Sequence, residues 1–347
     1  MGAVRRLKWF TAVNRRKYTA VTALLVFVSG CSLIQHSQLS YSAGENRQVE
    51  GTFSNYRDTY SLQVQGLTLL SYWGRTGTAV TQDIYSDIKK GDVSWLKTPE
   101  DFFRRLERER PQTRCRKTVR MGGNSCRRIL DGDKWLCLDE DVILKPPHCV
   151  VYSFGLSSEI TFDNMIAKYG CDVYMMDPTL PPGTYSWLHG KQKFFPIGLS
   201  DTSVIYQINL TTYADWQGMI NMTVTSFDNV HKMIGHSGAV HYLKMDIEGN
   251  EWKSVGYMME HDLLKGTQQI MVELHSGTFP TMPMDEAVLH FREKWLFLEQ
   301  LEDHGFLRVR YDPTLSIESI YNIPGTNRTM QICGEMFLIR RNRENLL

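Results

Sequence analysis

The sequence predicts an α/β domain with a seven-stranded, mostly parallel sheet, helices on both faces and an antiparallel last strand. Two observations predict this fold. From Cys149 onwards, short apolar runs alternate with segments of helical periodicity, as in a parallel sheet covered on both faces. The last two apolar runs are joined by a loop with Pro324 and Gly325 and no helix, so we expect an antiparallel pair there.

Each element is placed by its local pattern. A first helix begins at Thr98-Pro99, a capping residue followed by proline, and continues to about Arg110. Strands are expected at short runs rich in apolar and β-branched residues, namely Cys149–Phe154, Asp172–Met176, Lys193–Ile197, His241–Met245, Gln269–Leu274, Phe306–Tyr311 and Glu335–Arg340. Helices are expected at Ser158–Tyr169, Phe227–Gly235, Asn250–Leu264 and Asp285–His304.

The charge distribution argues against a nucleic-acid-binding protein. The formal net charge is +1, but residues 1–34 contain six basic residues and no acidic one. Residues 35–347 therefore carry 33 basic and 38 acidic residues, a net charge of about −5. A nucleic-acid-binding domain normally presents a basic surface, so no nucleic-acid partner is expected.

The N-terminus has the pattern of a membrane-targeting segment. A basic tail, residues 1–17, precedes the uncharged, mainly apolar residues 18–34. Their length is at the lower limit for a transmembrane helix, and the positive-inside rule directs the remainder of the chain to the lumen. We therefore expect a signal-anchor and a type II membrane protein of the Golgi or ER. A cleaved signal peptide, which would give a secreted protein, and a lipoprotein signal at Val28-Ser-Gly-Cys31 are the alternatives.

Cysteines and sequons agree with a lumenal domain. An even number of cysteines follows the apolar segment, which favours disulfides in an oxidising compartment, with the pairing left open. None has zinc-type spacing, so no metal is expected. Glycosylation sequons stand at Asn209, Asn221 and Asn327. The six cysteines are Cys115, Cys126, Cys137, Cys149, Cys171 and Cys333. Residues 35–110 are interpreted as a stem with its helix and residues 111–347 as the main domain.

The turn after the first sheet strand is a candidate cofactor site. Gly155 follows that strand and allows close approach of the backbone, and Ser157 stands at the expected helix start. Asp177 ends the second strand, where an acidic residue commonly accepts hydrogen bonds from a ribose diol. In open α/β sheets, ligands bind at these carboxyl ends of the strands.

Two further strands end in acidic residues and a histidine. Asp246 and Glu248 follow the strand that ends at Met245, and Glu273 and His275 end the next one. A histidine beside carboxylates can deprotonate a hydroxyl group. Asp246, Glu248 and His275 are therefore the candidate catalytic residues.

These motifs resemble the methyltransferase-like protein 24 family, which is related to FkbM-type methyltransferases. The resemblance covers roughly residues 115–340. It is carried by Trp135-Leu-Cys-Leu-Asp139, Val151-Tyr-Ser-Phe-Gly155, Tyr169-Gly-Cys-Asp-Val173, Asp177-Pro-Thr, Gly198-Leu-Ser-Asp201, Lys244-Met-Asp-Ile-Glu-Gly249 and Met271-Val-Glu-Leu-His275.

The resemblance implies a class I, Rossmann-like fold that binds S-adenosyl-L-methionine. It implies that Gly155 lies against the cofactor, Asp177 holds the ribose and Asp201 lies near the adenine. Asp246 would face the methionine part or the acceptor. FkbM-type relatives methylate oxygen atoms such as sugar hydroxyls, so the implied reaction is O-methylation of a glycan or another hydroxyl acceptor. Such a transfer requires alignment and a base but no metal.

Two other functions are compatible with parts of the sequence. A lumenal glycosyltransferase has the same membrane architecture, and Asp131-Gly-Asp133 and Asp139-Glu-Asp141 are acidic triplets that suit a divalent metal and a sugar nucleotide. A non-catalytic interaction module would keep the fold without the activity. The glycine-poor turn after the first strand favours this second alternative.

Overall fold

The computed structural model describes residues 59–64, 67–72, 85, 87–126, 129–157, 159–180, 183–213, 216–276, 279, 282–314, 319–323 and 326–341. The predicted basic tail and signal-anchor lie outside these residues. In the part of the chain that is described, no helix has the length and apolar character needed to cross a membrane.

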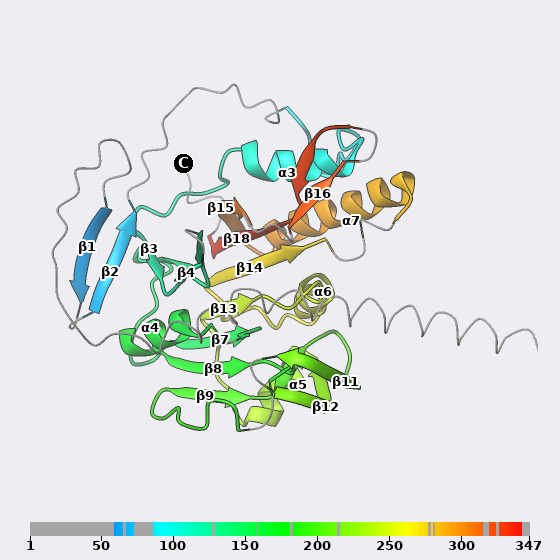
Figure 1. Cartoon of the computed structure of the whole chain (residues 1–347). Helices are drawn as coiled ribbons and strands as arrows, with labels where there is room; N and C mark the ends of the chain where they lie inside the picture. The colour runs from blue at the N-terminus through cyan, green and yellow to red at the C-terminus, as the bar shows by residue number, and fades with distance from the viewer. Residues whose placement is uncertain are drawn as a thin grey trace, which may run out of the picture. The chain divides into compact units, whose positions relative to one another are not determined.

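A seven-stranded mixed sheet forms the centre of the domain, as the sequence predicts (Figure 1). Four strand pairs are parallel, and β18 lies antiparallel between β14 and β15. The strand order is β15 (Phe306–Pro313), β18 (Cys333–Arg340), β14 (Gln269–His275), β13 (Tyr242–Met245), β7 (Val150–Phe154), β8 (Asp172–Met176) and β9 (Gln192–Phe195).

The predicted strand Lys193–Ile197 is divided in two. β9 ends at Phe195, and a separate strand, β10 (Ile197–Leu199), follows Pro196. Proline has no backbone N–H to donate to a sheet, which explains the break. β10 pairs instead with β12 (Trp216–Thr225).

The helices lie close to their predicted positions, and they are α3 (Pro99–Arg108), α4 (Thr161–Tyr169), α5 (Phe227–Ile234), α6 (Glu251–Glu260) and α7 (Met284–Asp303). α3 starts with a capping box between Thr98 and Asp101, as the Thr-Pro start indicates. α4 and α5 end at Gly170 and Gly235, both in the left-handed conformation. α4 packs on β8 and β9, whereas α6 and α7 pack on each other and on β14 and β15 respectively.

Several short strands have no counterpart among the predicted elements. Residues 111–147 contribute β3 (Thr118–Met121), β4 (Asn124–Cys126), β5 (Ile129–Asp131) and β6 (Lys134–Cys137). β3 and β6 join β1 (Thr59–Val64) and β2 (Leu67–Tyr72) in a four-stranded sheet. The expected plain loop around Pro324 carries a hairpin of β16 (Ile320–Asn322) and β17 (Thr329–Gln331).

The chain divides into two compact units. The larger one holds residues 55–205 and 223–347 and contains the seven-stranded sheet and the candidate site. Residues 206–222 belong to the other unit and include most of the hairpin of β11 (Val204–Tyr213) and β12.

Among the described residues, two disulfides form, Cys115–Cys137 and Cys149–Cys171, in agreement with the expected presence of disulfides. Cys149 and Cys171 directly precede β7 and β8, so this disulfide ties the amino ends of two neighbouring strands. The carboxyl ends of the same strands, at the opposite edge, carry the predicted site. Cys333 is a free thiol, and the side chain of Cys126 is outside the described part.

Candidate active site

The predicted site residues follow four neighbouring strands of the parallel part of the sheet. Gly155 and Ser157 follow β7, Asp177 follows β8, Asp246 and Glu248 follow β13, and His275 ends β14. Parallel strands present their carboxyl ends at one edge, which brings these residues to the same side of the domain (Figure 1).

Gly155 allows the ends of β7 and β13 to approach each other closely. Its φ is +76°, and a Cβ atom built there would lie 1.7 Å from the carbonyl oxygen of Asp246. The buried Lys244 supports the same turn, because its ammonium group donates to the carbonyl oxygens of Phe154, at 3.4 Å, and of Gly155. Gly155 is therefore required first for packing of the backbone at the site.

Asp177 holds the turn after β7. One carboxylate oxygen accepts hydrogen bonds from the backbone N–H groups of Leu156 at 2.9 Å and Ser157 at 3.0 Å. The other accepts from the backbone N–H of Thr179 at 2.8 Å and from its hydroxyl at 2.6 Å. A carboxylate has about four acceptor positions. The position of Asp177 matches the predicted ribose contact, but this structure uses its oxygens within the protein.

Among the described residues, four non-glycine residues have a positive φ; three of them belong to the loops after β7, β8 and β13, and the fourth, Asp262, follows α6. Ser157, Tyr185 and Glu248 have φ values of 50°, 58° and 55°, in the left-handed region that non-glycine residues rarely adopt. The Tyr185 hydroxyl donates to the carbonyl oxygen of Ser157 at 3.0 Å. Strained residues persist only where the surrounding structure holds them in place, and they are found preferentially at functional sites.

His275 is the point at which the predicted catalytic residues converge. Its Nε2 lies 3.8 Å from an Asp246 oxygen and 3.7 Å from a Glu248 oxygen. Its Nδ1 lies 3.1 Å from an oxygen of Glu251, which also accepts the backbone N–H of His275 at 2.7 Å. The structure thus brings Asp246, Glu248 and His275 together. Glu251 fixes the orientation of the imidazole through Nδ1.

Glu251 is a residue of the site that the sequence reasoning did not select. It is the first residue of α6, its exposed fraction is 1%, and its second oxygen accepts the backbone N–H of Gly249 at 2.9 Å. An acidic residue in the first turn of a helix is ordinarily interpreted as a helix-dipole partner. Its second role, orienting the imidazole of His275, is visible only in the structure, because the two residues are 24 positions apart in the sequence.

The local electrostatics are dominated by carboxylates. Burial and the charge of Asp246 raise the pKa of Glu273 to about 7. Burial alone would lower the pKa of His275, but Glu251, Glu273 and Glu248 raise it well above its usual value. Burial opposes ionisation of Asp246, yet Lys244 and His275 hold the pKa of its carboxyl below the usual value. The site is therefore suited to a positively charged ligand.

Asp201 has interaction partners other than His275 and the carboxylates around it. It follows β10 and interacts with Ser200 at 3.1 Å, Thr202 at 3.4 Å and Lys253 at 3.6 Å. Its predicted position near an adenine therefore rests on the resemblance. Among the described residues, Asp201 has no interaction with His275 or with the carboxylates of Asp246, Glu248 and Glu251.

Three acids of the triplets in the glycosyltransferase alternative, Asp133, Asp139 and Asp141, are engaged in contacts within the protein. Asp139 accepts the backbone N–H groups of Arg116 and Lys117 and, like Asp141, pairs with Arg341. Asp133 pairs with Arg120. Asp139 is also near Cys115 and Cys137, but these two sulfur atoms form a disulfide and offer no thiolate to a metal. These acids stabilise the segment before β7.

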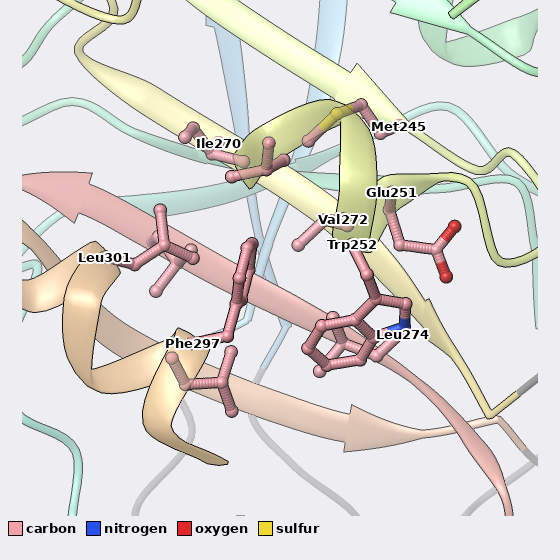
Figure 2. A pocket seen from close by; sticks show the side chains of 11 residues that line it. Met245, Glu251, Trp252, Ile270, Val272, Leu274, Phe297 and Leu301 are labelled. Carbon is pink, nitrogen blue, oxygen red and sulfur yellow. The ribbon is translucent and has the colours of Figure 1, made fainter. Parts of the chain in front are cut away.

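An apolar pocket lies between α6, α7 and the sheet (Figure 2). Glu251 is the charged side chain in its lining, and its carboxylate points away from the apolar residues around it. The polar groups of Glu251 and Trp252 are both engaged with His275, and the remaining lining is apolar, so we interpret the pocket as a packing gap behind His275. The apolar lining includes Met245, Val255, Ile270, Phe297, Leu301 and Leu338.

Comparison with known proteins identifies the class of this domain. Residues 71–322 match the Methyltransf_22 family, described as a methyltransferase domain. The chain therefore belongs to this family of methyltransferase domains.

Solved structures include two similar methyltransferases. One is FkbM from Methylobacillus flagellatus KT, with 11% identity, a TM-score of 0.30 and coverage of 57% of this chain. This chain spans 46% of that protein's length. The other is a putative methyltransferase from Thermoplasma acidophilum, with 11% identity, a TM-score of 0.26 and coverage of 58% and 71% of the two chains. No curated protein matches the sequence.

Proposed function

We propose that this protein is an S-adenosyl-L-methionine-dependent O-methyltransferase with a class I, Rossmann-like fold, of the methyltransferase-like protein 24 family. The observation that carries the proposal is the convergence of Asp246 and Glu248 on His275, beside the strained turn after β7. The family match and the insertion of antiparallel β18 between β14 and β15 support it.

The site residues fit such a donor in charge and position. When bound, S-adenosyl-L-methionine supplies a methyl group already activated by a positively charged sulfur. The carboxylates around Asp246 suit that positive charge. Gly155, Ser157 and Asp177 form the turn that would contact the cofactor, and Asp201 is assigned to the adenine end.

The catalytic role of this chain is to align the acceptor hydroxyl and receive its proton. Asp246 and Glu248 flank the imidazole, and both are acceptors when ionised. Glu251 keeps the ring of His275 in one orientation through Nδ1. The fixed ring leaves the two carboxylates 3.8 Å and 3.7 Å from one nitrogen, so that an acceptor hydroxyl would be aligned beside them.

The proposed acceptor is a glycan or another hydroxyl compound of the secretory pathway. The signal-anchor pattern, the two disulfides and the exposed sequon residues Asn221 and Asn327 support a lumenal, glycosylated, Golgi or ER protein. The membrane would be contacted through residues 18–34.

Isothermal titration calorimetry with S-adenosyl-L-methionine tests the proposal on the full chain with its disulfides intact. We expect micromolar affinity, weakened at least about tenfold by Asp177→Ala because the turn after β7 loses its anchor. The control is Asp172→Ala, which removes the same residue type at the opposite end of β8, where Asp172 forms only an exposed pair with Lys191. A folded wild-type protein without binding would contradict the proposal.

One observation favours a second candidate, a non-catalytic interaction module with the same fold. The oxygens of Asp177 are saturated by Leu156, Ser157 and Thr179, as in a turn that has no ligand to hold. Absence of cofactor binding in the calorimetric experiment would favour this candidate.

A further inference from the structure

Three potential metal ligands meet at the carboxyl ends of β13 and β14. Asp246, Glu273 and His275 each offer one ligand atom, and these atoms all lie within 4.8 Å of one another. Glu273 and His275 are two residues apart on β14, so both side chains leave the same face of the sheet. Met245 pairs with Val272, which places Asp246 next to Glu273 across the two strands. The arrangement is thus held by regular sheet structure.

The imidazole is oriented with its outer nitrogen toward Asp246 and Glu248, and a metal ion there would displace the proton of that nitrogen. Glu251, with an exposed fraction of 1%, binds Nδ1 of His275 at 3.1 Å and its backbone N–H at 2.7 Å. A carboxylate behind Nδ1 is the usual means by which proteins orient a metal-binding histidine. Among the described residues, no acceptor lies within hydrogen-bond distance of Nε2, since Asp246 and Glu248 are 3.8 Å and 3.7 Å away.

The nearby ammonium groups do not neutralise these carboxylates by direct hydrogen bonds. Lys134 pairs with Glu335, and Lys244 donates to the backbone carbonyls of Phe154 and Gly155. Glu273 accepts a hydrogen bond from the Thr314 hydroxyl at 2.8 Å, which orients its carboxylate, and it also hydrogen-bonds the carboxylate of Asp246. The three ligands therefore retain acceptor positions for a cation.

We propose that Asp246, Glu273 and His275 bind one divalent transition-metal cation, with its remaining positions open to water or to the acceptor hydroxyl. Two carboxylate oxygens and one imidazole nitrogen suit Mn²⁺ or Zn²⁺. Ligand atoms around such a cation lie about 3–3.5 Å apart, so side-chain rotation has to bring the three atoms somewhat closer. The role of the open positions rests on the proposed function, whereas binding of the cation does not. No metal was expected from the sequence, because neither the cysteines nor the histidines have the spacing of metal ligands along the chain.

Electron paramagnetic resonance of Mn²⁺ tests the site on the full chain, oxidised and stripped of metal with EDTA. We expect one Mn²⁺ per chain, competed by Zn²⁺, and at least about tenfold weaker binding in His275→Ala and Glu273→Gln. Glu273→Gln keeps the shape of the side chain and serves if His275→Ala does not fold. His261→Ala, at the exposed end of α6, is the matched control and should bind Mn²⁺ normally.

The outcomes separate this site from the proposed function. Wild-type protein that binds no Mn²⁺, or binding that both site variants leave unchanged, would overturn the metal site. Calorimetry with S-adenosyl-L-methionine in EDTA reports on the cofactor alone. Cofactor binding without Mn²⁺ binding would support the proposed methyltransferase and contradict the metal site. Mn²⁺ binding without cofactor binding would support the metal site and contradict the proposed methyltransferase.

Discussion

Gly155 shows how one missing side chain determines the geometry of the site. The carbonyl oxygen of Asp246 occupies the space in which a Cβ atom would lie, and φ is +76°. Any side chain at this position has to push β7 away from β13, and with it Asp246 away from the turn that would contact the cofactor. Both the packing of β7 beside β13 and the proposed cofactor contact therefore require a glycine at position 155.

Gly155→Ala is expected to destabilise the domain by about 3 kcal/mol or more, because steric overlap adds to backbone strain. Gly235→Ala is the matched control, since Gly235 also has a positive φ, +68°, but a methyl group added there would meet no atom within 4 Å. There we expect a loss of about 1 kcal/mol from strain alone. Urea denaturation measures both values, and equal losses would show that the approach to Asp246 does not matter.

Lys294 gives the domain a pH-dependent stability above neutral pH. It lies on α7, mostly buried, with its ammonium group 3.6 Å from the centre of the Trp252 ring. Burial lowers the pKa of Lys294 to about 7, and the charge of Glu251 opposes this shift only in part. Between pH 7 and the unfolded pKa of about 10.5, the unfolded chain binds a proton that the folded chain lacks.

The free energy of unfolding should therefore rise from pH 7 to pH 10 by roughly 2–4 kcal/mol from this residue. Lys294→Met keeps the length and removes the charge. We expect the difference between the wild-type and variant stability curves to shrink steadily over this range. Denaturation at closely spaced pH values measures it, and a constant difference would mean that Lys294 stays protonated.

At the scale of elements, β7 and β8 are constrained at both ends. The Cys149–Cys171 disulfide joins the residues that precede the two strands, and Asp177 joins the residues that follow them. Between these points the strands pair in parallel register, from Val150 with Asp172 to Phe154 with Met176. The edge that carries the site is thereby held on a rigid base, which suits precise positioning of ligands.

Removal of this disulfide by the double substitution Cys149→Ala and Cys171→Ala should cost about 3 kcal/mol. The sequence separation is 22, and closure of a loop of this length restricts the unfolded chain by about that amount. Cys333→Ser is the control, because Cys333 is a free thiol and its loss should change stability by less than about 1 kcal/mol. Chemical denaturation of the oxidised proteins distinguishes the two.

At the scale of the whole molecule, ligand binding should be visible as added stability. A ligand that binds only the folded state at a hundredfold excess over its Kd stabilises by about 2.7 kcal/mol. We expect S-adenosyl-L-methionine at such an excess to raise the Tm by several degrees. The Asp177→Ala variant should show a smaller shift at the same concentration. An unchanged wild-type Tm would agree with the interaction module and not with the methyltransferase.

The alternation of apolar runs and helical segments was sufficient to predict the seven-stranded sheet, because parallel strands are buried on both faces and read as continuous apolar runs. β13, for example, is buried at all of its positions from Tyr242 to Met245, and Lys244 is the one charged residue among them. Pairing of the last two strands also followed from the loop without a helix. β16 and β17 escaped prediction because each has only three residues, too few for a detectable period.

For the site, the sequence determined that Asp246, Glu248 and His275 lie at the ends of two strands, because strand ends are local properties of the chain. The role of Glu251, the saturation of Asp177 and the closeness of Asp246 to Glu273 depend on contacts between residues that are distant in sequence. The register that pairs Met245 with Val272 sets the last of these contacts. Only the tertiary structure decides such distances, because a shift in register by one residue would turn every side chain of the strand to the other face.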